Sequence, residues 1–475
     1  MLHRVEAPRA SASAVDRAKS RLDAEVGASK IVTGADALAA FAGDESENEP
    51  VLPDVAVRAE TAEDVRRVLR IAGETGVPVT PRAGGSGKSG GCIPVAGGIV
   101  LATSGLAAIK EIDRAEQIAV VEPGVVLADL HRAVETEGLF YPPDANSLTW
   151  CAIGGNVAEN AAGPRAFKYG ATRDYVLGLG VVTIGGDALT LGRRTKKGVT
   201  GYDLTSLVVG SEGTLAVVTE ATVRLIPKPE QVVTLMALFT DVHATGHAVT
   251  AMLDARVVPR CVELLDRATL DAVRKQGMAF DERAGAMLII EVDGSEAAVE
   301  TEMERAGSAC DGAGALTVLC AQDEAQRNRL WAARRALSPT TRAMAKFKVS
   351  EDVVVPRTKI GALLEEVDRI RERTGVSLLT YGHAGDGNLH VNFLWNDPAQ
   401  MASVRAGLDM LFRAVVAMRG TLTGEHGVGL SKAAYLPLEQ SADVIALQRR
   451  LKDAFDPKHL LNPGKMFTGE GHKAC

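Results

Sequence analysis

The sequence predicts an α+β protein of about two or three domains. Between Pro53 and residue 228, short strand-like apolar runs alternate with amphipathic helical segments. From residue 229 onward, two consecutive β-α-β patterns follow. The chain has 475 residues and is 46% hydrophobic, which is enough to form a core in each domain. The expected parts are an N-terminal segment, a first domain, a second domain and a C-terminal helical segment, at residues 1–50, 51–228, 229–430 and 431–475.

The first domain begins after a polar, Ala-rich segment that contains a helix around residues 14–26. Thr61-Ala-Glu-Asp64 is a capping-box pattern, and it predicts a helix that ends at Gly76. The run "VPVTPR" is then a strand that leads into a glycine-dense loop, and "GGIVLAT" and "IAVVEPGV" are further strands. "LADLHRAVETEG" is a helix, "YVLGLGVVTIGGDALTLG" is a hairpin, and strands continue to a proline-marked boundary near residue 228.

The second domain contains two strand–helix–strand units, which together favour a ferredoxin-like arrangement. In the first unit, "VVTLMALF" and "RCVELLD" flank the helix "DVHATGHAVTAMLDA". In the second, "AMLIIEVDG" and "ALTVLCA" flank "SEAAVETEMERAGSACD". The segment "SLLTYGHAGDGNLHVNF" is expected to supply strands of the same sheet or of its extension, and "SADVIALQRRLKDAFDP" a C-terminal amphipathic helix.

Composition argues against several classes of function. The net charge is −7 and the pI about 5.8, and no basic run interleaves with aromatic residues, so nucleic acid is not an expected partner. The six cysteines form no CxxC pair, which opposes an iron–sulfur or zinc-ribbon framework and favours a reducing compartment. The N-terminus lacks a secretory apolar core, and no apolar run approaches about 18 residues. We therefore expect a cytoplasmic protein, with peripheral association at an inner membrane left open.

The glycine-dense loop "PRAGGSGKSGG" partly matches two phosphate-binding motifs. Gly85 to Gly90 fits G-x-G-x-x-G, and Gly87-Lys88-Ser89 is the tail of a P-loop. However, Arg82 stands where a P-loop has its first glycine, and a strand follows where both motifs require a helix. A nucleotide-hydrolysing switch is therefore disfavoured. A glycine loop between two strands can still cradle a pyrophosphate through its backbone N–H groups, and a tight turn in a glycine-rich hairpin is the alternative.

Two glycine-rich, polar stretches concentrate histidines. "YGHAGDGNLHVN" contains His383 and His390, and "GEHGVG" contains Glu425 and His426. Imidazoles with a carboxylate suit a divalent transition metal, whereas a hydrogen-bonded histidine pair near a turn is the simpler alternative. His243 and His247 lack the glutamate of H-E-x-x-H and are typical of a solvated helix face.

The segment "NRLWAARRALSP" supplies Arg334 and Arg335. Arginine binds carboxylates in a bidentate manner, although two surface arginines on a helix would give the same pattern.

Several longer stretches resemble a known flavoprotein superfamily. "VLPDVAVRAETAEDV", "PRAGGSGKSGG", "GLFYPPDANSLTWCAIGGNVAENAAGPRAFKYG" and "VVGSEGTLAVVTEATVRLIPKP" are similar to the FAD-binding domain of the vanillyl-alcohol oxidase / p-cresol methylhydroxylase superfamily. Within it, the chain most resembles the D-2-hydroxyacid dehydrogenases, which include D-lactate dehydrogenases and the glycolate oxidase D subunit. The resemblance implies a p-cresol methylhydroxylase-type FAD-binding domain of two α/β subdomains. A ferredoxin-like antiparallel-sheet substrate domain and a C-terminal helical segment packing back on the FAD domain would follow.

The resemblance also implies which residues bind FAD. A covalent relative often carries a histidine in the glycine loop, where this chain has Ser86 and Lys88, so we expect non-covalent FAD. The implied cofactor-binding residues are Pro81, Gly84, Gly85, Ser86, Gly87, Lys88, Ser89, Gly90, Pro143, Ile153, Gly154, Gly155, Asn156, Asn160, Val217, Val218 and Asn462.

The same resemblance assigns roles to the histidine stretches. His383, His390 and Glu425 match the ligands of a divalent metal, for which we expect zinc, with manganese or iron as alternatives. Four further matches are catalytic or substrate-binding: His426 as the base, Asn392 as a substrate contact, Arg334 as the carboxylate-binding arginine, and Lys348 as a second cationic candidate.

The expected activity is FAD-dependent oxidation of a D-2-hydroxy acid to the 2-oxo acid, with D-lactate or glycolate favoured as substrate. A separate electron-accepting protein or a quinone or cytochrome carrier would reoxidise the flavin. The alternatives are a D-2-hydroxyglutarate dehydrogenase, an O2-using oxidase of the same fold, and a non-redox relative such as an alkyl-dihydroxyacetonephosphate synthase-like transferase. The last group lacks the histidine and glutamate set. We further expect a homodimer.

Overall fold

The computed structural model describes residues 7–275, 277 and 280–467. The chain forms two compact units. The first comprises residues up to 162, residues 171–228 and the chain from 425 onward, and the second comprises 163–170 and 229–424.

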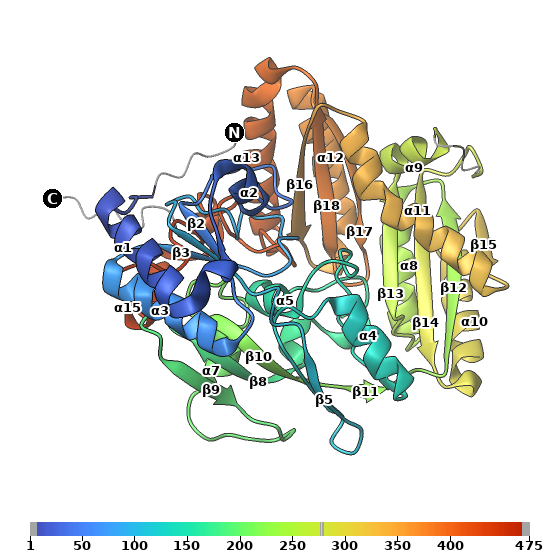
Figure 1. Ribbon diagram of the computed structural model, residues 1–475. Coiled ribbons are helices and arrows are strands. Elements are labelled where there is room, and N and C mark those ends of the chain that lie inside the picture. The colour runs from blue at the N-terminus through green and yellow to red at the C-terminus, as the bar shows by residue number, and fades with distance from the viewer. Residues whose placement is uncertain (1–6, 276, 278–279, 468–475) are drawn as a thin grey trace. The chain divides into compact units, whose positions relative to one another are not determined.

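The first unit contains two main sheets (Figure 1). A four-stranded sheet has the order β1-β2-β4-β3, in which β2, β4 and β3 are parallel. A five-stranded antiparallel sheet has the order β5-β6-β10-β8-β9, and β7 pairs with β11. The strands are β1 Ile31–Val32, β2 Val55–Arg58, β3 Val79–Arg82, β4 Ile99–Ala102, β5 Ile109–Asp113, β6 Ile118–Val121, β7 Leu139–Phe140, β8 Val176–Val182, β9 Ala188–Gly192, β10 Val217–Arg224 and β11 Ile226–Pro227.

Helices of the first unit cover the parallel sheet and connect its strands. Apolar side chains of α1 and α3 pack with those of β2, β3 and β4 in one core cluster, and Figure 1 shows the two helices side by side. The helices are α1 Ala12–Leu22, α2 Ala35–Leu38, α3 Ala62–Thr75, α4 Leu127–Thr136, α5 Ile153–Glu159, α7 Leu204–Val208, α14 Leu436–Glu439 and α15 Ala442–Phe455.

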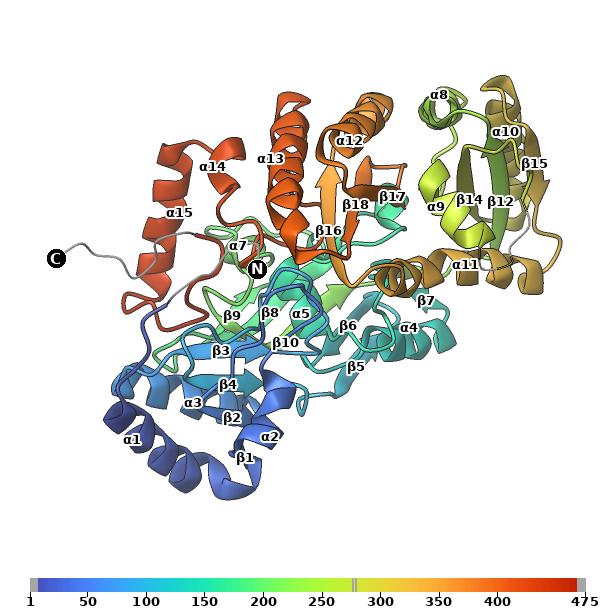
Figure 2. The ribbon, with the colours of Figure 1, turned by 90° about the horizontal axis from the view of Figure 1, so that it is seen from above.

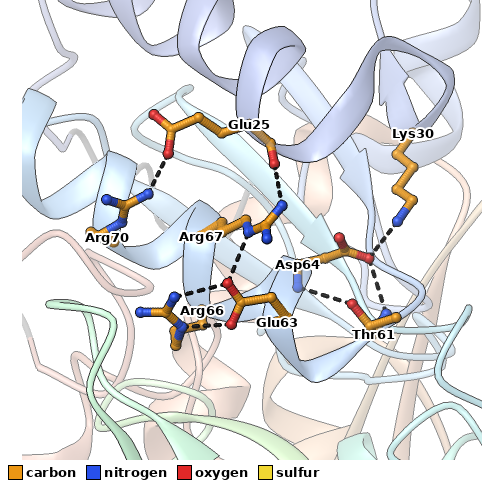
Figure 3. Close-up of polar contacts among 8 residues, drawn as sticks. All are labelled: Glu25, Lys30, Thr61, Glu63, Asp64, Arg66, Arg67 and Arg70. Carbon is orange, nitrogen blue, oxygen red and sulfur yellow. Dashed lines mark hydrogen bonds and ion pairs between the residues drawn. The ribbon is translucent and has the colours of Figure 1, made fainter.

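The start of α3 confirms the predicted capping box. The Thr61 hydroxyl accepts from the backbone N–H of Asp64 at 3.1 Å, and the Asp64 carboxylate accepts in return from the backbone N–H of Thr61 at 3.0 Å. Figure 3 shows this cap beside Lys30, whose ammonium also donates to Asp64. Gly76 ends the helix in the left-handed conformation with φ +72°, as predicted.

One buried lysine anchors helix α15 within the first unit through hydrogen bonds. The Lys452 ammonium donates to the backbone oxygens of Thr214 and Leu461, each at 2.7 Å, and to the carboxylate of Asp456 at 2.6 Å. Since Asp456 also accepts the backbone N–H of Leu461, this network fixes the chain that leads into Asn462.

The second unit is built on one seven-stranded antiparallel sheet of order β15-β12-β14-β13-β17-β18-β16. Its first four strands have the ferredoxin-like order, and the remaining three extend the same sheet, so both predictions are confirmed. The strands are β12 Gln231–Phe239, β13 Cys261–Asp266, β14 Ala286–Gly294, β15 Thr317–Cys320, β16 Phe347–Val354, β17 Ser377–His383 and β18 Asn388–Trp395.

Helices cover the two faces of this sheet unequally. Figure 2 shows α13, α12, α8 and α10 along one face and α11 on the other. Apolar side chains of α9 and α11 pack with Met236, Leu379 and Tyr381 on the face of α11. The helices of this unit are α6 Ala166–Tyr169, α8 Val242–Asp254, α9 Arg267–Arg274, α10 Glu296–Gly312, α11 Glu324–Ala343, α12 Ile360–Thr374 and α13 Met401–Ala417.

The face covered by α11 also contains polar positions. Strand registers place Glu291, Cys261, Glu263 and His383 on it, because Glu291 lies opposite Cys261 and Glu263 lies opposite His383. A sheet face with carboxylates and an imidazole beside an apolar core is where a polar site can form.

Candidate active site

The glycine loop between β3 and β4 is tightly constrained by the backbone around it. A Cβ on Gly84 would lie 2.5 Å from the carbonyl oxygen of Trp150, and Gly85 and Gly90 adopt φ of +73° and +84°. Gly87 differs, because a Cβ added there would have Oδ2 of Asp44, at 3.8 Å, as its nearest neighbour. The loop therefore needs glycine for its own shape at most positions, whereas at Gly87 a Cβ would fit at an ordinary contact distance.

Three polar atoms near this loop are buried without a hydrogen-bond partner among the described residues. They are Oγ of Ser89, Oδ1 of Asn462 and Oδ2 of Asp44. Nδ2 of Asn462 donates to the backbone oxygens of Gly91 and Glu212 at 2.9 and 2.8 Å, so this side chain borders the loop. Burial raises the pKa of Asp44, a residue that the motif did not indicate. The Ser89 hydroxyl can donate to a phosphate, whereas Oδ1 of Asn462 and an ionised Asp44 can only accept, from hydroxyl or N–H groups of a ligand. The Ser89 hydroxyl and the uncrowded backbone at Gly87 fit a bound phosphate group.

The other residues expected along the flavin lie on neighbouring elements. Ile153 to Asn156 belong to α5, and a Cβ on Gly155 would lie 3.6 Å from Cβ of Ala83 in the glycine loop. Asn160 ends α5 with φ +53°. The structure thus brings α5, the glycine loop and Asn462 together within the first unit.

Four expected cofactor residues have less distinctive surroundings. Val217 is part of the apolar core around α3, and Val218 follows it on β10. The carbonyl oxygen of Pro143 is bonded to Nε2 of His131 at 2.9 Å, and the side chain of Lys88 is exposed. Their contact with FAD stays a prediction.

Glu212 is a site residue that the sequence motifs missed. Its buried carboxylate accepts the backbone N–H groups of Val428 and Gly429, each at 2.7 Å, and it adopts φ +53°. Burial raises the pKa of Glu212 despite these two bonds. The carboxylate therefore fixes the backbone two residues after His426. Only its position between two glycines in "GSEGT" hinted at an unusual conformation.

The two predicted histidine ligands lie side by side on adjacent strands. His383 ends β17, His390 lies opposite Tyr381 on β18, and the two imidazole centroids are 5.3 Å apart. A tight turn joins the strands, and at Gly387 a Cβ would lie 2.0 Å from the carbonyl oxygen of Val355. Both histidines are buried.

Glu425 completes the group. It directly follows Gly424, whose backbone N–H donates to Oδ2 of Asp352 at 2.9 Å. One ligand atom from each of His383, His390 and Glu425 lies within 4.8 Å of the others. Two imidazoles and a carboxylate at this spacing fit a divalent cation such as zinc, and with three protein ligands a further coordination position remains for a small molecule. His426 follows, with Nε2 3.9 Å from Oε1 of Glu425.

Glu263 links two of the predicted site residues. Oε1 of this fully buried glutamate is 2.5 Å from Nδ1 of His383, and Oε2 accepts from Nε of Arg334 at 2.5 Å. Burial alone would raise the pKa of Glu263, but Arg334 and His383 outweigh it and lower the pKa to about 2. No sequence motif pointed to this residue, which occupies an ordinary position in the strand "CVELLD".

The predicted cationic and amide contacts also have partners within the protein. Arg334 is buried on α11 with its guanidinium 5.0 Å from the centroid of the Tyr381 ring, whereas Arg335 is exposed. The ammonium of Lys348 donates to Oγ1 of Thr341 at 2.7 Å. Nδ2 of Asn392 donates to the backbone oxygen of His390 at 2.9 Å. These bonds give Lys348 and Asn392 structural roles, and their contact with a substrate stays a prediction.

Two family models match the chain. "FAD binding domain" matches residues 53–192, and "FAD linked oxidases, C-terminal domain" matches residues 228–466. The chain belongs to the FAD-linked oxidases. It is a FAD-linked oxidoreductase, and the resemblance noted from the sequence is confirmed.

Known proteins similar to this FAD-linked oxidase include 2-hydroxyacid enzymes. The glycolate oxidase subunit GlcD of Bacillus subtilis is 40% identical over 89% of this chain and 90% of its own length. A D-lactate dehydrogenase of Anaerostipes hadrus is 33% identical over 87% of this chain and 89% of its own. Oxidation of a 2-hydroxy acid with FAD is the activity class that these relatives support.

The fold agrees with that of a solved flavoprotein. p-Cresol methylhydroxylase with bound substrate superposes with a TM-score of 0.82 at 16% identity, covering 98% of each chain. The prediction of a p-cresol methylhydroxylase-type FAD-binding domain with an antiparallel-sheet second domain is confirmed. Among the residues that the structure describes, no helix is both long and apolar enough to cross a bilayer.

Proposed function

We propose that this FAD-linked oxidase converts a D-2-hydroxy acid, D-lactate or glycolate, to its 2-oxo acid with the help of a divalent cation. The observation that supports it most directly is the cluster of His383, His390 and Glu425, with ligand atoms within 4.8 Å of one another. The buried Arg334 joins the same cluster through Glu263. A cation-binding group beside an arginine suits a substrate that has a hydroxyl and a carboxylate on adjacent carbons.

Arg334 and the bound cation would contact different groups of such a substrate. Nε of Arg334 is bonded to Glu263, so the terminal Nη groups are the donors that this arginine can offer to a carboxylate. Arginine binds carboxylates with planar, paired hydrogen bonds, which would fix the orientation of the Cα–H bond. Zinc, or manganese or iron in its place, would supply Lewis acidity toward the substrate hydroxyl.

His426 is the proposed base. An imidazole has an ordinary pKa near neutrality, so it can accept the hydroxyl proton as the alcohol becomes a ketone. Glu212 accepts the backbone N–H groups of Val428 and Gly429 and so restrains the loop that contains His426. When bound, FAD would supply the redox chemistry, as the acceptor of a hydride from Cα.

We propose that three residues of the first unit hold FAD. The Ser89 hydroxyl and the backbone at Gly87 would contact a phosphate group, and Oδ1 of Asn462 would accept from a hydroxyl or N–H group of the cofactor. A separate acceptor, a protein or a quinone or cytochrome carrier, would take up the two electrons. D-2-Hydroxyglutarate as substrate, or O2 as acceptor, are the alternatives.

The test is anaerobic reduction of the bound flavin. The purified protein is mixed with D-lactate, L-lactate, glycolate or D-2-hydroxyglutarate, with and without prior chelation, and absorbance is followed near 450 nm. We expect D-lactate or glycolate to bleach the flavin, L-lactate to leave it oxidised, and chelation to abolish bleaching. His390→Ala should behave like the chelated protein, whereas His247→Ala, at an exposed position of α8, should behave like wild type. A bound flavin that none of the acids reduces would contradict the proposal.

A further inference from the structure

Glu263 occupies the point where the cation-binding group and the arginine meet. It lies on β13 opposite His383 of β17, and its side chain is completely buried. Each of its oxygens has a different partner: Oε1 lies 2.5 Å from Nδ1 of His383, and Oε2 lies 2.5 Å from Nε of Arg334. A single carboxylate therefore contacts both side chains.

The contact with His383 has a chemical consequence for the other nitrogen of that ring. An ionised carboxylate can only accept, so the proton of a neutral imidazole must reside on Nδ1. Nε2 is then unprotonated, and its lone pair is available to bind a cation. A hydrogen bond to the non-ligating nitrogen also fixes the ring plane and makes the ligating nitrogen more basic.

The contact with Arg334 acts on the guanidinium. Arg334 extends from α11 onto the sheet, and its guanidinium lies 5.0 Å from the centroid of the Tyr381 ring. Because the guanidinium is planar, a bond at Nε sets the direction in which its terminal nitrogens point. The same carboxylate thus orients a cation ligand and an anion-binding group.

We propose that Glu263 is a positioning residue that couples the cation site to the substrate-carboxylate site through His383 and Arg334. This inference rests on the proposed function and adds a residue to it. The neighbouring Glu291 on β14 provides a contrast within the same sheet. It is also buried and accepts from a side chain of α11, Nε1 of Trp331 at 2.5 Å, but it also contacts Thr234, Arg260 and Cys261.

The variant Glu263→Gln tests the proposal with almost no change in shape. Arg334 can only donate, so the amide oxygen of the glutamine must face it, and the amide NH2 group then faces Nδ1 of His383. Nδ1 becomes an acceptor, and the proton moves to Nε2. We expect zinc affinity to fall by about 10–100-fold.

Three measurements compare wild type, Glu263→Gln and the matched control Glu291→Gln, all as FAD-loaded protein. The zinc dissociation constant comes from competition with a chromophoric chelator after metal removal. Long-range ¹H–¹⁵N spectra of metal-free protein report the tautomer of His383. Steady-state kinetics separate KM from kcat for the hydroxy acid, and flavin content verifies that the first unit is intact.

We expect the imidazole of His383 to be protonated on Nδ1 in wild type and in Glu291→Gln, and on Nε2 in Glu263→Gln. Zinc affinity should fall only in Glu263→Gln. KM should rise in that variant because the neutral amide oxygen accepts a weaker hydrogen bond from Nε of Arg334 and orients the guanidinium less firmly. A wild-type His383 with its proton on Nε2 would overturn the inference without any variant having to fold. Wild-type zinc affinity in Glu263→Gln, or a wild type that binds neither zinc nor manganese, would also overturn it.

The two proposals can fail separately. If the protein binds zinc in the predicted way but no 2-hydroxy acid reduces its flavin, the proposed function fails, whereas the zinc and tautomer results still support the role of Glu263 at the cation site. If the acids reduce the flavin and Glu263→Gln retains wild-type zinc affinity and tautomer, the function stands and Glu263 is only a structural residue.

Discussion

The backbone N–H of Gly424 donates to Oδ2 of Asp352 at 2.9 Å, one residue before the proposed cation ligand Glu425. The Asp352 carboxylate is fully buried and also accepts from Oγ1 of Thr423 at 3.1 Å. It lies opposite His390 in the pairing of β16 with β18. One carboxylate thus restrains the backbone that presents Glu425.

Replacing Asp352 should therefore weaken cation binding. In Asp352→Ala the N–H of Gly424 keeps the backbone oxygen of Asp352 as an acceptor at 2.9 Å, but Gly424 and Thr423 both lose the carboxylate. We expect zinc affinity to fall by about tenfold. Competition with a chromophoric chelator measures the change. Asp368→Ala, at an exposed position of α12, is the control and should bind zinc like wild type. Unchanged affinity in Asp352→Ala would mean that Glu425 needs no such restraint or does not bind the cation.

Gly87→Ala should separate folding from cofactor binding. The added Cβ meets no described atom nearer than 3.8 Å, so the chain without FAD should fold with a melting temperature close to that of wild type. If a phosphate group lies against this backbone, the methyl group will displace it, and we expect flavin content to fall at least about tenfold. Absorbance ratios of the purified protein and thermal melts of apoprotein measure the two quantities. Full flavin content in Gly87→Ala would place the phosphate elsewhere.

Lys452→Met should destabilise the first unit. The ammonium of Lys452 has three acceptors within 2.7 Å, and its removal leaves the buried Asp456 carboxylate without its cation. Breaking a buried ion pair costs about 3–5 kcal/mol of unfolding free energy. Urea unfolding followed by flavin fluorescence provides the measurement. The matched control is Lys458→Met, which removes a bond to the carbonyl oxygen of Gly73 at an exposed site and should cost about 0.5 kcal/mol or less.

Asp266 should make the second unit less stable as the pH rises, which is opposite to the effect of a carboxylate whose pKa is lowered by folding. Burial raises the pKa of Asp266 to about 6 from its ordinary value of 3.8, although it caps α9 by accepting from Thr269 N–H. Between these two values the folded protein binds more protons than the unfolded chain, so the contribution of Asp266 to stability is lost as pH rises from about 4 to 6. The loss amounts to about 3 kcal/mol.

The variant Asp266→Asn isolates this effect from other carboxylates. We expect the unfolding free energy of the variant, minus that of wild type, to increase by about 3 kcal/mol between pH 4 and pH 7. Circular dichroism melts at several pH values would measure this. A difference that stays constant with pH would show that Asp266 titrates at its ordinary pKa.

The local elements were predictable because their signals lie within a few residues. Thr61 and Asp64 form a cap across three positions, and Gly76 ends the same helix. The β-α-β patterns similarly predicted the strands of the ferredoxin-like sheet. The helix α5 was not predicted, because Gly154 and Gly155 lower its helix propensity and their neighbourhood resembles a loop. Helices α9, α12 and α13 and strands β5 and β16 were likewise absent from the prediction, and a helix at α11 was only the alternative interpretation of Arg334 and Arg335.

Part of the candidate site was likewise predictable from the sequence, and part was not. The sequence by itself determined which residue types the proposed cation site would use, because His383 and His390 lie in one glycine-rich motif and Glu425 lies in a second. Only the tertiary structure decided that Glu263 joins His383 to Arg334, since these partners are 120 and 71 residues away along the chain. Glu212 lies 216 residues before the backbone it holds. A buried carboxylate on a strand has no local signature, because its partners are fixed by sheet register and helix packing, and those depend on the whole chain.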